Sequence, residues 1–208
     1  MDIIAHRINT TKQLEDIPRD YGIELDIRYH NDELILHHDP FSHHKEPYPC
    51  LFEDLLKKWT NTGTMILNVK TEGIEQVCID LMNKYNIANW FFLDLSMPYF
   101  AIYAEKAYNN EINGFTSDNL AVRFSEREPI EYAIAFACKA KWVWVDCFTK
   151  MPLNDNNYKI LKDAGFKICI VSPELQKHST DRIIEFRQML EKYDIDAVCT
   201  KRADLWLK

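Results

Sequence analysis

Short apolar runs alternate with amphipathic stretches along most of the chain. We predict strands at 3–6, 22–29, 33–38, 64–70, 90–95, 112–117, 142–148, 167–172 and 196–200. Several of these runs are continuously apolar, as in parallel strands that are covered on both faces. Between them, the pattern predicts helices at 50–59, 74–85, 98–108, 129–139, 156–165 and 180–193. This alternation of strand and helix indicates an α/β fold.

The strands at 22–29 and 33–38 are separated by a polar turn that is too short for a crossover helix. We therefore interpret them as barrel strand two continuing into a β-hairpin extension, which leaves eight parallel strands. A doubly wound sheet is the alternative, but no GxGxxG or P-loop pattern supports it. With no internal repeat or Gly/Ser/Pro-rich linker, we predict a single domain over 1–208, a (β/α)₈ TIM barrel with short loops.

Charge and composition exclude several classes of protein. A formal net charge of −7 argues against a nucleic-acid-binding protein, which needs a basic face to meet phosphates. No run approaches the roughly 18 apolar residues of a transmembrane segment, and the N-terminal segment does not have the pattern of a signal peptide. The six cysteines form no CxxC pair, and most lie in apolar runs, so we expect reduced thiols buried in the core of a cytoplasmic protein. None of these features indicates an oligomeric state.

Polar residues gather where the first predicted strands end, and in a barrel the chemistry is found at the C-terminal ends of the strands. These residues are His6, Arg7, Glu24, Asp26, His38, Asp39, Asn68 and Lys70. Strand alternation places Glu24 and Asp26 on one face, and likewise Asn68 and Lys70. If that face is the barrel interior, one pocket collects acids, an amide, basic groups and two imidazoles.

The same segments resemble the glycerophosphodiester phosphodiesterase family, within the PLC-like phosphodiesterase superfamily. They are "IIAHR", "GIELDIRYHNDELILHHD", "LFEDLL" and "ILNVK". The family pattern has HR after the first strand, ExD in the second, HD after a hairpin and ExK on a later strand. The match covers about the first third of the chain with order and spacing intact, and the remainder agrees only in its α/β alternation.

The resemblance implies a role for each matched residue. His6 and His38 would be the acid–base pair, and Asp39 would orient His38. Arg7 and Lys70 would hold the substrate phosphate. The ligands of a divalent cation, Mg²⁺ or Ca²⁺, would be Glu24, Asp26 and, at the third position, Asn68.

This chemistry is consistent in itself. A phosphodiester anion repels nucleophiles, so a hard cation and nearby basic side chains must neutralise it. The leaving alkoxide needs a proton, and histidine can both take and give one near neutral pH. The expected substrate is a small-molecule or polymer phosphodiester, and its alcohol group is not specified by the sequence.

Three features depart from the family pattern. Ile8 stands where the family has glycine, and Asn68 replaces the acid of ExK. Only "PFSHHKEPYP", with a polar loop at 43–46, separates Asp39 from the next helix, so the capping insertion of many members is missing. Two alternatives stay open: a barrel that binds phosphate ligands without turnover, and a lyase-like enzyme that makes a cyclic phosphate.

Three further residues are candidates on weaker grounds. Asp94 and Asp146 lie near strand ends and could replace the lost acid. Arg123, in a predicted loop over 116–129, is either a solvated arginine or a contact for a second anionic group. Trp142 and Trp144 share one strand face, which is more typical of a core.

Overall fold

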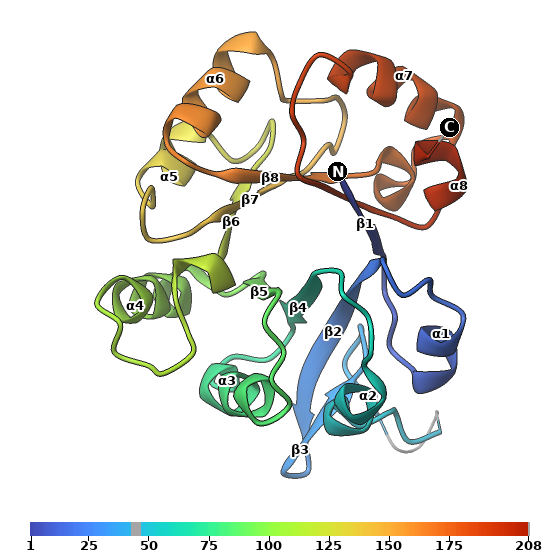
Figure 1. Ribbon diagram of the computed structural model, residues 1–208, viewed down its shortest axis with the longest axis vertical. Helices are drawn as coiled ribbons and strands as arrows, with labels where there is room; N and C mark the ends of the chain where they lie inside the picture. The colour runs from blue at the N-terminus through green and yellow to red at the C-terminus, as the bar shows by residue number, and fades with distance from the viewer. Residues whose placement is uncertain (43–46, 208) are drawn as a thin grey trace.

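The computed structural model describes residues 1–42 and 47–207, and Figure 1 shows most of its strands in the middle of the molecule, with helices around them and β3 at the lower edge. Residues 43–46, predicted as a polar loop, lie outside the described residues. The strands are β1 (Asp2–Ala5), β2 (Gly22–His30), β3 (Glu33–Leu36), β4 (Met65–Val69), β5 (Trp90–Leu93), β6 (Ala121–Phe124), β7 (Trp142–Val145), β8 (Lys167–Val171) and β9 (Ala197–Thr200). The α-helices are α1 (Thr11–Glu15), α2 (Phe52–Lys58), α3 (Glu75–Lys84), α4 (Met97–Tyr108), α5 (Ile130–Ile134), α6 (Asp155–Asp163), α7 (Asp181–Leu190) and α8 (Ala203–Trp206). Two 3₁₀ helices are η1 (Ser117–Asn119) and η2 (Pro173–Gln176).

Eight of these strands run parallel in the order β5-β4-β2-β1-β9-β8-β7-β6, and β3 pairs only with β2. The two ends of this sheet approach each other through a parallel bridge between Phe92 and Leu120. The sheet therefore forms a nearly closed barrel in which helices alternate with strands. The predicted (β/α)₈ TIM barrel is confirmed.

The hairpin extension of strand two is also confirmed. β2 pairs antiparallel with β3 from Ile27 opposite Leu36 to His30 opposite Glu33. Asn31 and Asp32 form the two-residue turn with φ values of 48° and 64°, a conformation that asparagine and aspartate tolerate. The hairpin thus returns the chain to Ile27, where the pairing of β2 with β4 ends, and the His37 amide then donates to the Asp26 carbonyl.

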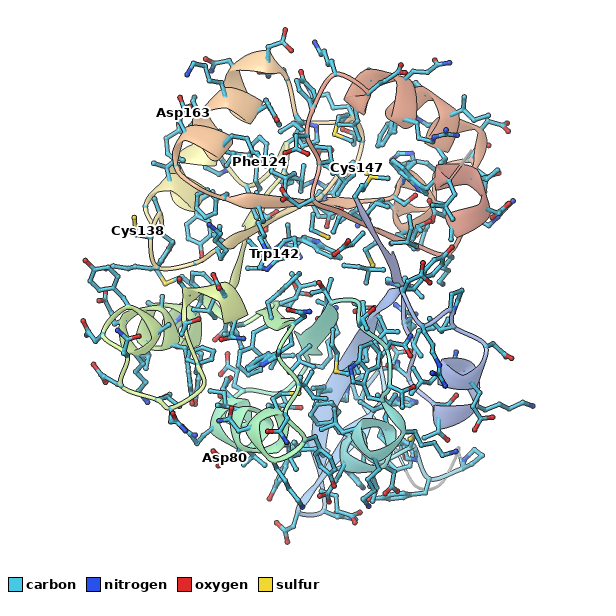
Figure 2. The ribbon with its side chains drawn as sticks, viewed as in Figure 1. Asp80, Phe124, Cys138, Trp142, Cys147 and Asp163 are labelled. Atoms are coloured by element: carbon cyan, nitrogen blue, oxygen red, sulfur yellow. The ribbon has the colours of Figure 1, made fainter. Side chains whose placement is uncertain are left out.

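Apolar side chains fill both faces of the barrel wall, which explains the continuously apolar strands. One cluster lies inside the barrel and includes Ile4, Phe91, Trp142 and Trp144. A larger cluster lies mainly between the strands and the helices. Figure 2 shows Trp142 in the middle of the molecule, with polar and exposed side chains at the periphery. Burying each large apolar side chain stabilises the fold by about 1.5–3 kcal/mol.

The predicted strand at 112–117 is wrong. These residues form turns and the start of η1, and the strand lies instead at β6, within the 116–129 segment predicted as a loop. Phe115 is buried against aromatic rings of β5 without pairing in the sheet. Gly114 has φ of 71°, which interrupts any extended backbone. Arg123 consequently lies in a barrel strand and not in a solvated loop.

The helices differ from the prediction mainly in their ends. α5 ends at Ile134 instead of residue 139, and the residues after it form turns. The sequence did not indicate α1 and α8, since helices of five and four residues are too short to show a periodic pattern. None of the helices in the described residues is long and apolar enough to cross a membrane.

The six cysteines are free thiols. Four are buried, Cys50 is half-buried, and Cys138 is exposed, so the expectation of buried thiols does not extend to the last. Burial raises the pKa of Cys147 to about 12, which keeps this thiol protonated and unreactive near neutral pH.

Candidate active site

A cavity of about 270 Å³ lies at the C-terminal ends of the barrel strands. Six of the eight predicted site residues line it: His6, Arg7, Asp26, His38, Asn68 and Lys70. The other two contact lining residues, because Glu24 accepts a hydrogen bond from Asn68 and Asp39 lies against His38. Larger cavities of about 530 and 500 Å³ beside α7 contain none of the eight. The predicted residues therefore meet at one end of the barrel.

The end of β1 is shaped by an unusual backbone conformation at Arg7. Its φ is 60°, which costs a non-glycine residue about 1–3 kcal/mol. In this conformation the Arg7 amide donates a 2.8 Å hydrogen bond to Glu24 Oε2. His6 Nε2 lies 3.6 Å from the same oxygen. The turn after β1 thus places the His6 imidazole and the Arg7 amide beside the same oxygen of the buried Glu24 carboxylate.

Glu24 is fully surrounded by protein. Asn68 Nδ2 donates a 2.8 Å hydrogen bond to its Oε1, and Arg7 occupies its Oε2. Burial and the neighbouring Asp26 carboxylate raise the pKa of Glu24 to about 7, although the hydrogen bonds from Asn68 and Arg7 oppose this rise. Near neutral pH this carboxyl group is therefore only partly ionised, and a cation bound beside it would favour the ionised form.

Asp26 is held by a residue that the sequence did not single out. Asn9 Nδ2 donates to Asp26 Oδ2 at 2.9 Å, and the Asp26 amide donates to Asn9 Oδ1 at 2.9 Å. Arg7 Nε lies 3.6 Å from Oδ2, and Lys70 Nζ lies 3.6 Å from Oδ1. The only sequence signal for Asn9 was its position, two residues after Arg7 in the same strand-end segment.

His38 is positioned by a neighbouring acid and by an arginine. Its Nδ1 lies 2.8 Å from Asp39 Oδ1, and this contact lowers the pKa of Asp39. Arg28 donates from Nε and Nη2 to the His38 carbonyl, at 3.2 and 2.8 Å, and from Nη1 to the Lys70 carbonyl at 3.1 Å. Arg28 follows Glu24 and Asp26 at the same two-residue spacing, a signal that could have identified it.

His6 is an unusually weak base in the free protein. Burial, followed by the positive charges of Lys201 and Arg7, lowers its pKa to about 3. Its Nδ1 is buried and lacks a hydrogen-bond partner among the described residues. His6 therefore carries a neutral imidazole throughout the physiological pH range.

The opposite wall of the cavity is built around Arg123. Its guanidinium contacts Asp94 at 2.6 Å, Glu128 at 2.7 Å and Asp146 at 2.8 Å. Although burial opposes its charge, these three carboxylates raise the pKa of Arg123. Three acids already neutralise this arginine, so it is poorly suited to hold a second anionic group of a substrate.

Asp94 and Asp146 are likewise engaged. Asp94 has φ of 60° and bridges Arg123 to Lys70, whose Nζ lies 3.4 Å from Asp94 Oδ2. Asp146 accepts hydrogen bonds from Arg123, Gln176 and the Cys147 amide. These contacts favour a role as counter-charges for the basic residues over a role as replacement metal ligands.

Whether the site could hold a divalent cation depends on oxygen atoms that accept no hydrogen bond. Within residues 1–42 and 47–207, no group of three or more His, Cys, Asp or Glu side chains could hold a metal ion. However, Asp26 Oδ1 and Asn68 Oδ1 are buried and have no hydrogen-bond partner among those residues. Two carboxylates and an amide oxygen are suitable ligands for Mg²⁺ or Ca²⁺. Asp26 and Asn68 thus each have an oxygen that could bind such an ion, and Glu24, whose two oxygens accept hydrogen bonds from Asn68 and Arg7, would complete the set with less negative charge than three acids supply.

Comparison with known proteins adds evidence on the fold. No protein-family model matches the chain, and no curated protein matches its sequence. Among solved structures, a glycerophosphodiester phosphodiesterase from Agrobacterium tumefaciens str. C58 aligns with a TM-score of 0.71 at 13% identity, over 100% of this chain and 99% of that one. A glycerophosphoryl diester phosphodiesterase from Parabacteroides distasonis ATCC 8503 aligns with a TM-score of 0.67 at 13% identity, over 99% of this chain and 84% of that one.

A third structure shows how far this likeness extends. The α subunit of tryptophan synthase from Campylobacter jejuni aligns with a TM-score of 0.55 at 12% identity, over 96% of this chain and 86% of that one. Proteins of different function thus share this barrel, and a fold does not specify an activity. The two phosphodiesterase structures support the resemblance that the motifs indicate, and at 13% identity the likeness itself establishes the barrel fold.

Proposed function

We propose that this protein is a metal-dependent phosphodiesterase that acts on a glycerophosphodiester-like compound and releases an alcohol and a phosphomonoester. One observation carries the proposal: two histidines, two basic residues and an acid–amide pair line the same small cavity at the C-terminal end of the barrel. Each stands at a position of the phosphodiesterase motif, and at one of them Asn68 replaces the acid. The formal net charge of −7 favours a small-molecule or non-nucleic-acid polymer as the substrate.

The side chains divide the work of this reaction. Arg7 and Lys70 hold the phosphate, and a cation held by Glu24, Asp26 and Asn68 would supply further positive charge to neutralise it. His6, which is neutral, accepts a proton from water as the water oxygen bonds to phosphorus. His38, oriented by Asp39, donates a proton to the alcohol oxygen as its bond to phosphorus breaks. The bound phosphate anion offsets the positive charges that weaken His6 as a base.

The test is a screen of purified protein against phosphodiesters, with Mg²⁺ or Ca²⁺ and with EDTA. The panel includes glycerophosphocholine, lysophospholipids and glycerol-phosphate polymers. We expect one class to be cleaved and EDTA to stop the cleavage. Product mass distinguishes hydrolysis from the lyase-like alternative, because a cyclic phosphate is one water lighter. No cleavage of any diester with either ion would contradict the proposal.

A barrel that binds phosphate ligands without turnover is the second candidate. Asn68 favours it, because this amide occupies the third ligand position and adds no negative charge to the cation site. Calorimetry with glycerophosphocholine in the presence of Mg²⁺ separates the two candidates. Saturable binding without product after prolonged incubation would support the binding protein, whereas product formation supports the enzyme.

A further inference from the structure

A second cavity, of about 410 Å³, adjoins the catalytic residues. It lies between the ends of β1 and β9, which are adjacent parallel strands, and the helices that follow them, α1 and α8. Figure 1 shows these two helices on the same side of the molecule, to the right of β1. Its apolar wall consists of Ala5, Ile8, Ile17, Pro18, Tyr21 and Ala203.

The two cavities share His6 and Arg7, which line both. A phosphate held by Arg7 therefore lies at the junction of a polar space and an apolar one. The polar cavity, at about 270 Å³, is below the roughly 300–1,000 Å³ of typical ligand pockets, whereas the apolar one falls within that range. A substrate larger than its phosphate group thus has room for a substituent in the apolar cavity.

One departure from the family pattern contributes to this apolar surface. Ile8 replaces the glycine of the family's HRG, and this residue is 7% exposed and lines the cavity. Lys201 also lines this cavity, and its positive charge acts on the His6 imidazole. An apolar cavity with Arg7 and Lys201 at the side of the catalytic imidazole suits an anion that carries an apolar group.

We infer that the cavity between α1 and α8 binds an apolar group esterified to the substrate phosphate, so that the substrate is an amphiphilic phosphodiester. This inference rests on the proposed function, since it assigns the phosphate to Arg7. Each methylene group that enters the cavity leaves water and should tighten binding about three- to fourfold.

The first experiment measures binding without turnover. Methyl, butyl and hexyl phosphate are titrated into the full chain by calorimetry, with Mg²⁺ present. We expect hexyl phosphate to bind at least tenfold more tightly than methyl phosphate. Equal affinities for the three esters would overturn the inference.

Two cavity variants and a matched control locate the effect. Ala203→Phe fills the cavity and Ile17→Gln makes its wall polar, so each should reduce the hexyl-over-methyl preference to less than threefold. Ala101→Phe introduces the same ring at a half-buried position of α4, outside the cavity, and should keep the preference. Circular dichroism verifies that each variant folds. If Ala203→Phe does not fold, the result for Ile17→Gln tests the assignment. A preference that survives in every folded cavity variant would contradict the assignment.

A second experiment separates this inference from the proposed function. Turnover is measured for glycerophosphate esters of methanol, butanol and hexanol. Cleavage of all three with equal kcat/KM would leave the phosphodiesterase standing and overturn the apolar subsite. Failure to cleave any of them, with hexyl phosphate still bound at least tenfold more tightly than methyl phosphate, would overturn the enzyme and retain the subsite.

Discussion

The Asn68 side chain donates a hydrogen bond from Nδ2 to Glu24 Oε1 at 2.8 Å, in the interior of the barrel end. This contact satisfies one oxygen of a buried carboxylate without neutralising its charge. It also turns Asn68 Oδ1 away from that partner, and this oxygen has no hydrogen-bond donor among the described residues. The amide can therefore support a cation, but it cannot match the charge of the acid that it replaces in the motif.

Restoring an acid at this position should tighten cation binding. In Asn68→Asp, three carboxylates would surround the ion, so we expect Mg²⁺ and Ca²⁺ to bind at least about tenfold more tightly, or about 1.4 kcal/mol. Without a cation the third buried charge should lower the melting temperature, and adding the ion should restore it. Calorimetric titration of wild type and variant measures the affinity. Equal affinities would mean that residue 68 does not face the metal.

A second buried amide provides the control for this variant. Asn119 donates from Nδ2 to the Trp90 carbonyl, and its Oδ1 accepts from the Thr116 amide. Asn119→Asp should destabilise the protein by a similar loss of buried hydrogen bonding. Because Asn119 is not part of the cation site, Mg²⁺ and Ca²⁺ should not restore its melting temperature.

Cation affinity should depend on pH through Glu24. Its pKa rises from an ordinary value near 4.5 to about 7, so below about pH 7 a proton competes with the cation. We expect Mg²⁺ affinity to fall by about tenfold from pH 8 to pH 6, as measured by calorimetry. Glu24→Gln should bind the ion weakly at both pH values. A wild-type affinity that does not change between them would contradict the competition.

The same carboxyl group affects stability in the metal-free protein. Between about pH 4.5 and 7 the folded state holds a proton on Glu24 that the unfolded chain has lost. The free energy of unfolding should therefore decrease as the pH rises through this window. Denaturant unfolding of wild type and Glu24→Gln at pH 5 and 8, in EDTA, measures the difference, and the variant should lose this part of the pH dependence.

Removal of either imidazole should nearly abolish turnover. General acid–base catalysis contributes about 10²–10⁴-fold, so His6→Ala and His38→Ala should each lose kcat/KM by that order while remaining folded. His178→Ala is the control, because His178 contacts the Cys147 carbonyl and does not line the cavity. If both site variants stay within a few-fold of wild type, the proposed acid–base pair is wrong.

The fold could be predicted from the sequence because its main signals are local. The apolar strands, and the turn at Asn31 and Asp32, are properties of short segments, and the C-terminal-end rule then brought His6 and His38 together. Arg123 could not be placed in the same way. Its charge interrupts the short β6, and the acids that neutralise it lie directly after β5, directly after β7 and in a loop, so only the folded barrel explains its burial.

The contacts that position the site residues could not be predicted from the sequence, although the spacing of Arg28 marks the residue itself. Asn9 meets Asp26 across 17 positions of the chain, and Arg28 meets the Lys70 carbonyl across 42. Neither contact follows from periodicity. Arg7 has a positive φ in the strand-end turn, where its amide donates to Glu24. The family's glycine stands one residue further along, so the motif does not predict this backbone conformation at Arg7.

Lys70 should contribute to phosphate binding. Its Nζ lies 3.6 Å from Asp26 Oδ1 and 3.4 Å from Asp94 Oδ2, so it makes no short hydrogen bond to either carboxylate. Lys70→Met removes the charge, and we expect kcat/KM to fall at least about tenfold through a higher KM, a lower kcat or both. Cation affinity should be retained. Lys57→Met, which removes a surface partner of Asp54, should leave the kinetics unchanged, and unchanged kinetics in Lys70→Met would mark Lys70 as structural.

The protonation of His6 should respond to Lys201. Burial is the largest cause of its lowered pKa, and Lys201 is the next, so Lys201→Gln should raise the pKa without returning it to the usual 6.5. The folded state resists protonation of His6 between about pH 3 and 6.5, and this residue therefore reduces stability as the pH falls through that range.

An NMR titration of the His6 ring measures the shift, with Lys192→Gln as a control at a lysine that is paired with Asp155. Added inorganic phosphate should also raise the pKa in wild type, because an anion beside Arg7 offsets the same positive charges. A His6 titration that is identical in wild type, in Lys201→Gln and with phosphate would mean that burial alone sets its protonation, and that the imidazole is not electrostatically coupled to the phosphate site.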